Sequence, residues 1–411
     1  MTLTRLPVST RRPRLIALYS HDTQGLGHVR RNITLAAALV ADEPDTDVLL
    51  LTGAPEATML PLPPRTDVIT LPALRKDRHG AYAGRSLRAP LPQLLRLRSQ
   101  MLRATLLGFA PDLLVVDKVP RGVDGELDDA LTALRPTPTR VVLGLREVLD
   151  EPEVARREWA AARSTEAVRD LYDAVWVYGD ASAYDVVAEC GLPAAVAEKV
   201  DWTGYLGDGR GVGTRTRTRP VPRLRPPDGP YVLCLVGGGQ DGLELGDAFA
   251  RAALPAGHEG VVLSGPYMRP AAREALRRAV AGNPGMTVHE FVPDADRWVQ
   301  DAAAVVSMAG YNSVCELLAA HRRTLLVPRT TPRVEQLLRA RSLERRGLVD
   351  VLDPELADPV RIGAWLADAV LAGPPAGAPV DLAGLRRVPR LAAALLAGSS
   401  VPTPDVERAA V

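Results

Sequence analysis

Short apolar runs alternate with candidate helices along most of the chain. The runs end at Gly, Pro or charged residues, as buried strands commonly do. Strands that alternate with helices form parallel sheets covered by helices on both faces, so the pattern predicts an α/β protein. The expected strands cover residues 15–19, 48–52, 68–71, 113–116, 141–145, 175–178, 200–204, 231–236, 261–263, 288–291, 305–306 and 325–327.

Helix starts can be placed from the residues that follow the strands. The first helix is expected from about Asn32 to Val40, after a glycine-rich turn. A second helix is expected to begin after Asp150, which is placed to cap it. This helix has Pro152 in its first turn and runs to about Leu171. The last helices are expected around residues 360–371 and 385–396.

The alternation stops between residues 207 and 230, a stretch rich in Gly, Pro, Arg and Thr. This composition, without an apolar period, is typical of a linker between domains. The order of strand, glycine-rich loop and helix at Leu15 recurs at Val232, which indicates two Rossmann-like domains. We therefore expect a first domain over 1–206, a linker over 207–230, a second domain over 231–384, and a last helix and tail over 385–411.

Composition narrows the function classes. A chain of 411 residues can hold two cores, and a net charge of +1 argues against bulk nucleic-acid binding. Cys190, Cys234 and Cys315 lack metal-ligand spacing and lie in or beside apolar runs, as buried thiols do in a reducing cytosol. No apolar run is as long as a membrane span, and the N-terminal segment lacks a signal-peptide core. These features predict a cytoplasmic protein that binds no nucleic acid.

A basic stretch over residues 75–103 has two interpretations. Its later part carries leucines at helical spacing, so it is expected to form an amphipathic helix with a solvated basic face. Alternatively, the basic face contacts an anionic acceptor or a membrane surface, which would make the protein peripherally membrane-associated.

The stretch from residue 303 to 340 carries the most specific pattern. A strand stops at Gly310, and a helix follows with Asn312 or Ser313 near its first turn and Glu316 one turn further in. Unpaired amides and the helix dipole favour an anion at such a start. A second strand and loop then lead to Glu335 and Gln336 at the start of another helix. A diphosphate flanked by two sugars fits this order of anion site, acceptors and donors.

This order resembles the donor half of GT-B glycosyltransferases, most closely the family-28 type. The resemblance implies two Rossmann-like domains facing across a cleft, with the first domain binding the acceptor, the second binding the nucleotide sugar, and the last helix returning to the first domain. It implies that Glu316 binds the ribose hydroxyls, that Glu335 and Gln336 bind the transferred sugar, and that Gly310 lies beside the diphosphate. The alternative is an ordinary βαβ unit in which Glu316 is a solvated helix residue. If only one of these residues were present, this alternative would be favoured. By the same resemblance, Gly238, Gly239 and Gln240 form a loop beside the diphosphate and acceptor, and the backbone of Phe291 and Val292 contacts the base.

A glycine-rich turn after the first strand leads to His28. Gly25 and Gly27 precede it, and Gly27-His28 matches the end of the family's Gly-Gly-His loop, with looser glycine spacing. The resemblance implies that His28 is the catalytic base, with Asp22 as the reserve candidate. A loop histidine is often a simple surface residue, and His21 is a nearby competitor.

Charged residues also follow two later strands of the first domain. Asp117 ends one strand, and Arg146 and Glu147 end the next. Ligands of open α/β sheets bind beyond the carboxyl ends of the strands, so these residues are acceptor-side candidates. An ion pair between Arg146 and Glu147 that serves structure alone is about equally compatible with the sequence.

The resemblance implies a function as well as a fold. We expect an inverting, metal-independent transferase that moves a sugar from a nucleotide diphosphate sugar, such as a UDP-sugar, to an acceptor hydroxyl without another cofactor. The acceptor would be a small molecule, a glycan or a lipid-linked molecule. Two alternatives remain: a sugar-nucleotide epimerase or hydrolase that uses Asp117 and Glu147 around the sugar, and a non-catalytic sensor of nucleotide sugars.

Overall fold

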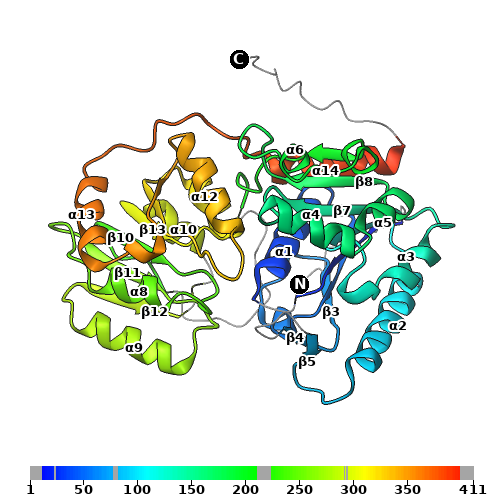
Figure 1. Ribbon diagram of the computed structural model, residues 1–411, viewed down its shortest axis with the longest axis horizontal. Helices are drawn as coiled ribbons and strands as arrows, with labels where there is room; N and C mark the ends of the chain where they lie inside the picture. The colour runs from blue at the N-terminus through cyan, green and yellow to red at the C-terminus, as the bar shows by residue number, and fades with distance from the viewer. Residues whose placement is uncertain are drawn as a thin grey trace, which may run out of the picture.

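The computed structural model describes residues 12–22, 25–76, 82–210, 224–290, 292 and 295–398. Within these residues, two parallel sheets with helices on both faces form two lobes (Figure 1). The α/β class and the predicted pair of Rossmann-like halves are therefore confirmed. The predicted linker lies mostly outside the described residues, since 211–223 are not among them. The domain boundaries stay a prediction.

The first sheet has the strand order β3-β2-β1-β6-β7-β8-β9, and all of its neighbouring strands are parallel. Alternate residues of each strand enter different cores, because successive side chains point to opposite faces. The strands are β1 (Arg14–Ser20), β2 (Thr46–Thr52), β3 (Thr66–Thr70), β6 (Leu113–Asp117), β7 (Arg140–Arg146), β8 (Ala174–Tyr178) and β9 (Val200–Trp202). The helices of this lobe are α1 (Gly27–Asp42), α2 (Leu91–Phe109), α3 (Asp128–Leu134), α4 (Pro152–Ala161), α5 (Ser164–Leu171), α6 (Val186–Glu189) and α7 (Ala194–Ala197), and a small antiparallel pair joins β4 (Leu74–Lys76) to β5 (Tyr82–Gly84).

The second sheet has the order β12-β11-β10-β13-β14-β15, again with parallel neighbours. Its strands are β10 (Tyr231–Leu235), β11 (Glu259–Leu263), β12 (Met286–His289), β13 (Ala304–Ser307), β14 (Thr324–Leu326) and β15 (Asp350–Val351). Its helices are α8 (Leu243–Ala250), α9 (Pro270–Ala281), α10 (Ala295–Asp301), α11 (Tyr311–Ala320), α12 (Glu335–Arg345) and α13 (Pro359–Ala369).

Each sheet has a point where the strand order reverses. In the first sheet the chain leaves β1 toward β2 and β3 and then returns to β6 on the other side of β1. In the second sheet β10 and β13 hold the corresponding positions. Loops diverge at such points, and ligands of open α/β sheets bind there, beyond the carboxyl ends of the strands.

The last helix, α14 (Gly384–Ala397), packs on the first lobe. It lies against α1, and its Leu385, Val388 and Leu391 share a core with β1 and α1 (Figure 1). Tyr311 and Cys315 of α11 enter the same core from the second lobe. The two lobes are therefore joined by continuous apolar packing.

Two expected helix positions are wrong. α1 begins at Gly27 and not near Asn32, because the Asp22 carboxylate accepts a hydrogen bond from Val29 N (3.2 Å) and so holds the first turn. Behind Asp150 the chain forms α4 and α5, separated at Arg163, whose φ of 51° interrupts the helix. Asp150 does not cap α4 with its side chain; it pairs with Arg333 of the second lobe.

Candidate active site

The loop after β1 is held by a buried aspartate. Asp22 accepts hydrogen bonds from the Thr52 hydroxyl (2.6 Å), the Ser20 hydroxyl and Val29 N. Burial raises the pKa of Asp22 despite these donors and the nearby His28. The structure therefore gives this reserve base a clear role in shaping the loop that precedes His28.

His28 lies in the first turn of α1, and its Nδ1 contacts the carboxylate of Asp117 at the end of β6. Arg31, three residues further on, donates from Nε to Asp117 Oδ1 (2.9 Å) and is itself buried. Helical spacing places His28 and Arg31 on the same face of α1, so both can reach one carboxylate. These contacts join the ends of β1 and β6 at the reversal point of the sheet.

The contact with Asp117 selects the histidine tautomer. Nδ1 also lies 3.0 Å from Arg31 Nη2, which only donates, whereas the ionised carboxylate of Asp117 only accepts. The contact with Asp117 is the shorter of the two and favours the tautomer with the proton on Nδ1 and the lone pair on Nε2. Asp117 is ionised: burial opposes this, but Arg31 and His28 hold its pKa well below the ordinary value. Burial lowers the pKa of His28, and Asp117 only partly offsets the effect. A neutral imidazole with a free Nε2 is the form that can accept a proton near pH 7.

His21 is the competing histidine, and its ring centroid lies 5.0 Å from that of His28. It is buried, and its Nδ1 has no hydrogen-bond partner among the described residues. Burial and the neighbouring His28 lower its pKa well below the ordinary value. It lacks the carboxylate that orients His28.

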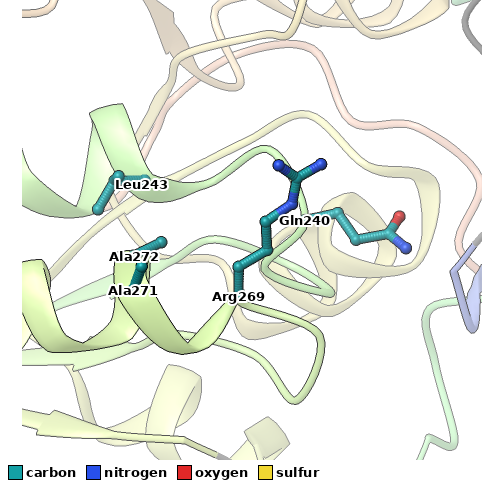
Figure 2. A pocket seen from close by; sticks show the side chains of 5 residues that line it. All are labelled: Gln240, Leu243, Arg269, Ala271 and Ala272. Atoms are coloured by element: carbon teal, nitrogen blue, oxygen red, sulfur yellow. The ribbon is translucent and has the colours of Figure 1, made fainter.

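Glycine-rich loops from the two lobes approach one another. A Cβ atom built on Gly25 would lie 3.9 Å from Gln240 Oε1. Gly239 has a φ of 90°, and a Cβ there would lie 2.2 Å from Ser264 O, so the tight turn requires glycine. Gly238 accepts a backbone hydrogen bond from Tyr267 N (2.9 Å). Beside this loop is an open cavity of about 490 Å³, where the Arg269 side chain rises from the start of α9 beside Gln240 (Figure 2).

The start of α11 lies against the start of α1. Asn312 Nδ2 donates to Gly27 O (2.9 Å), so the helix turn that carries His28 is tied directly to α11. Gly310, the residue before α11, has nothing within 4 Å of a built Cβ, so the backbone there is open to close approach. Ser313 is half-buried in the same turn.

Glu316 is buried one turn further along α11. Its Oε1 accepts from Arg30 (3.2 Å) and from Arg210 (3.1 Å), which belongs to the segment after β9. Its side chain is 4% exposed, so it is not the solvated helix residue of the alternative interpretation. Beside it is a cavity of about 270 Å³ bordered by Arg210, Asp296, Gln300 and Arg386. Of the two residues expected to contact the base, Val292 is buried and Phe291 lies outside the described residues.

Glu335 and Gln336 open α12, as predicted. Arg329 holds both: its Nη2 donates to Glu335 Oε1 (2.8 Å), and its backbone N donates to Gln336 Oε1 (3.1 Å). Burial would raise the pKa of Glu335, but Arg146, Arg329 and Arg339 outweigh it and lower that pKa. Glu335 Oε2 is buried with no partner among the described residues, so an acceptor atom is left over in the interface.

Glu147 and Arg146 do not form the ion pair that the sequence allowed. Glu147 pairs with Arg339 of α12 (Nε to Oε1, 2.6 Å), and both side chains are fully buried. Arg146 Nε is buried without a partner among the described residues. Of the two adjacent acceptor-side candidates, Glu147 connects the lobes and Arg146 has its charge uncompensated by direct contact.

Several arginines that the sequence did not single out organise the interface. Arg333 pairs with Asp150 and Glu158 of the first lobe, and Arg31 and Arg339 neutralise Asp117 and Glu147. Arg31 and Arg339 follow His28 and Gln336 by three residues, a helical spacing that could have suggested a shared face. Lys118, next to Asp117, was also missed, although it is one of only three lysines in the chain.

Two wider features concern membranes and metals. No helix among the described residues combines the length and apolar character needed to cross a bilayer, and no cluster of metal-ligating side chains is found in the same residues. The expected basic helix forms as α2, but Arg98 is fully buried on Glu126 (Nη2 to Oε1, 2.8 Å), so this arginine is not part of a solvated face.

Residues 264–372 match the family described as glycosyltransferase family 28 C-terminal domain. This part of the chain resembles the C-terminal domain of that family. The match covers β13, α11, β14 and α12, which hold Glu316, Glu335 and Gln336. Over 211 residues the chain is 29% identical to the UDP-N-acetylglucosamine–N-acetylmuramyl-(pentapeptide) pyrophosphoryl-undecaprenol N-acetylglucosamine transferase of Sorangium cellulosum (strain So ce56). That alignment spans 45% of this chain and 52% of the relative, about half of its length.

Solved structures show the same fold. A calicheamicin glycosyltransferase is 18% identical, with 95% of this chain and 96% of that chain covered and a TM-score of 0.55. The Streptomyces nogalater glycosyltransferase SnogD is 17% identical, covering 94% and 100%, with a TM-score of 0.52. A proposed UDP-N-acetylglucosamine 2-epimerase from Listeria monocytogenes is 12% identical, covering 95% and 98%, with a TM-score of 0.59. The predicted GT-B fold and the resemblance to family 28 are confirmed.

Proposed function

We propose that the protein is a glycosyltransferase that moves a sugar from a nucleotide diphosphate sugar to an acceptor hydroxyl. The observation that carries this proposal is the junction between α1 and α11. Asn312 of the family-28 domain bonds to Gly27 O, next to His28 with its free Nε2 and its buried partner Asp117. A candidate base and the helix start expected to hold the donor diphosphate are thus adjacent across the lobes.

In the proposed reaction, His28 Nε2 accepts the proton of the acceptor hydroxyl as its oxygen attacks the anomeric carbon. The bond between that carbon and the diphosphate breaks from the opposite side, which inverts the configuration. Asp117 orients the imidazole and stabilises the imidazolium that forms, so it acts as a positioning residue. The leaving diphosphate gains stabilisation from the start of α11 and the Gly239 loop, whose amides and helix dipole favour negative charge. We propose that these groups replace a metal ion.

Donor recognition is assigned to the residues of α11 and α12. Glu316 would bind the ribose hydroxyls, in place of its present contacts with Arg30 and Arg210. Gln336 and the unpaired Glu335 Oε2 would bind the transferred sugar. The name of the Sorangium relative gives UDP-N-acetylglucosamine as its donor, so UDP-sugars are the first donors to test.

The two alternative functions receive less support. An epimerase or hydrolase would need free carboxylates around the sugar, but Asp117 is engaged by His28 and Arg31, and Glu147 by the buried Arg339. A non-catalytic sensor would have no need for a histidine with an oriented tautomer. A cytoplasmic location and contact of the 75–103 stretch with an anionic acceptor or membrane stay predictions.

The proposal is tested by a thermal-shift screen of nucleoside diphosphates and their sugars, followed by an acceptor screen that measures nucleoside diphosphate release. Ligands that bind the native state raise the melting temperature. We expect stabilisation by one nucleotide sugar, and release of its nucleoside diphosphate only when an acceptor is present. Release at the same rate without any acceptor would indicate a hydrolase, and binding without turnover across the acceptor screen would favour the sensor.

A further inference from the structure

Lys118 and Arg146 stand at the carboxyl ends of the neighbouring strands β6 and β7. Lys118 follows Asp117, which is in register with Gly144, and its backbone N donates to Gly144 O (2.8 Å). The φ of Lys118 is 69°, in the left-handed region that a residue with a side chain seldom adopts. Such backbone conformations concentrate at ligand sites, where the surrounding structure imposes them.

In the parts of the chain that the structure describes, neither cation has a counterion in contact. Among the described residues, the Lys118 ammonium makes no hydrogen bond or ion pair, and the buried Arg146 Nε has no partner. Their neighbours are paired: Asp117 with Arg31, Glu147 with Arg339, and Asp150 and Glu158 with Arg333. Glu335 of the other lobe acts to raise the pKa of both cations, and its Oε1 is held by Arg329.

The position of these cations shows which way they face. The pKa of Lys118 falls to about 7 because of burial and the nearby Arg146 and Arg333, while Glu335 acts in the opposite direction. Arg333 and Glu335 belong to the second lobe, so the ammonium faces the interface between the lobes. Burial, Arg339 and Arg31 lower the pKa of Arg146 to about 10. Both residues are half-buried, and leaving two partly desolvated cations unpaired is costly unless a ligand compensates them.

We propose that Lys118 and Arg146 form a binding site for an anionic group, phosphate or carboxylate, of the acceptor substrate. The inference rests on the proposed glycosyl transfer, and it narrows the acceptor to an anionic molecule. Both residues belong to the first lobe and stand at the carboxyl ends of β6 and β7, the edge of the sheet that also holds Asp117. Asp117 is the partner of His28, and His28 would take the acceptor proton. The donor diphosphate is assigned to the opposite lobe, at Gly310 and Gly239.

The test uses the full chain with Lys118→Met, Arg146→Met and the control Arg140→Met. Arg140 lies at the other end of β7, where its exposed side chain pairs with Asp173, so the control removes an equal charge far from the cleft. Melting temperatures are measured with inorganic phosphate and with malonate, each with and without a saturating nucleoside diphosphate. The phosphate and malonate arms separate a phosphorylated acceptor from a carboxylated one.

We expect phosphate or malonate to stabilise the wild type and Arg140→Met, including when the nucleotide is bound. Lys118→Met and Arg146→Met should each weaken binding of the anion by about tenfold, as expected for loss of one charge-assisted contact. Nucleoside diphosphate affinity should change by less than about threefold, because the donor site is separate. Without ligand, Arg146→Met should melt no lower than the wild type, since an unpaired, half-buried cation is removed.

Several results would overturn the inference. These are no stabilisation of the wild type by either anion, equal stabilisation of all variants, or loss of the anion effect once the nucleotide is bound. A tenfold loss of nucleoside diphosphate affinity in Lys118→Met or Arg146→Met would assign the cations to the donor. A large drop in the melting temperature of Arg146→Met without ligand would show a structural role. If no nucleotide binds the wild type, the proposed function fails, whereas the anion measurements without nucleotide still decide this site.

Discussion

Arg210→Met offers a sharp test of the donor site, because Arg210 occupies the carboxylate assigned to the ribose. Glu316 Oε1 accepts from the buried Arg210 at 3.1 Å and from the more exposed Arg30 at 3.2 Å. Both guanidinium groups contact Oε1, so a nucleotide that uses this oxygen must displace them. Methionine keeps most of the aliphatic volume of Arg210 and removes the competing charge.

The magnitude follows from the exposure of the two contacts. A hydrogen bond between charged groups with little solvent contact is worth about 1.5–3 kcal/mol, whereas the exposed Arg30 pair is worth about 0–1 kcal/mol. Removing Arg210 should therefore tighten nucleoside diphosphate binding by about tenfold or more, since 1.4 kcal/mol corresponds to a factor of ten. Glu316→Ala should weaken it, by less than the roughly 2–4 kcal/mol of two charge-assisted bonds, because the wild type must first break the arginine contacts.

The assay is isothermal titration calorimetry with UDP and dTDP, with melting temperatures as a check on folding. Arg386→Met is the matched control, because Arg386 borders the same cavity but pairs with Asp208 and not with Glu316. The double variant Glu316→Ala/Arg210→Met should bind like Glu316→Ala alone, since the competing contact no longer exists. Weaker binding in Arg210→Met would show that Arg210 contacts the nucleotide, and unchanged binding in a folded Glu316→Ala would remove Glu316 from the site.

Three further predictions concern the base, the sugar and the interface. His28→Ala should lower turnover by about 10²–10⁴-fold with donor affinity retained, and a variant with more than about a tenth of wild-type turnover would argue for Asp22 instead. Burial lowers the pKa of His28, and a base must be deprotonated to act. The wild-type rate should therefore stay constant near pH 7 and fall only at pH values below the ordinary histidine pKa. A fall in rate at higher pH would show that another group titrates. Gln336→Ala and Glu335→Gln should weaken binding of the intact sugar nucleotide and leave nucleoside diphosphate affinity nearly unchanged. Equal losses of affinity for both ligands would place these residues at the nucleotide. Glu147→Ala should destabilise the protein by about 3–5 kcal/mol, because it leaves the buried Arg339 unpaired. Denaturant unfolding measures this, with Arg140→Met as the control, and equal unfolding midpoints for the two variants would contradict the prediction.

The sequence predicted most of the strands and the loops after them because both have local signatures, but it missed the short strands β4, β5 and β15. Apolar runs define β1, β6, β10 and β13, and glycines mark the turns where backbone must bend tightly or approach a ligand. Because parallel strands end at the same edge of a sheet, His28 and Asp117 could be assigned to one edge before their contact was known.

The contacts between lobes had no such signature. Glu147 could pair with Arg146 or with any of many arginines, and its partner is Arg339, far away in the sequence. The same holds for Asp150, whose position before α4 is typical of a cap but whose carboxylate pairs with Arg333. In a chain whose positive charge is nearly all arginine, local spacing does not identify which long-range ion pair forms.

The return of α14 to the first lobe has a consequence for engineering this protein. The first lobe is built from two separated pieces of chain, since α14 completes the core against α1 after the whole second lobe has been made. Exchanging the donor half with that of a relative would therefore need two junctions, one within 207–230 and one between α13 and α14. A chimera cut only at the first junction would inherit a foreign terminal helix and place it on the native α1. Libraries that recombine donor specificities should keep residues 384–397 with the N-terminal half.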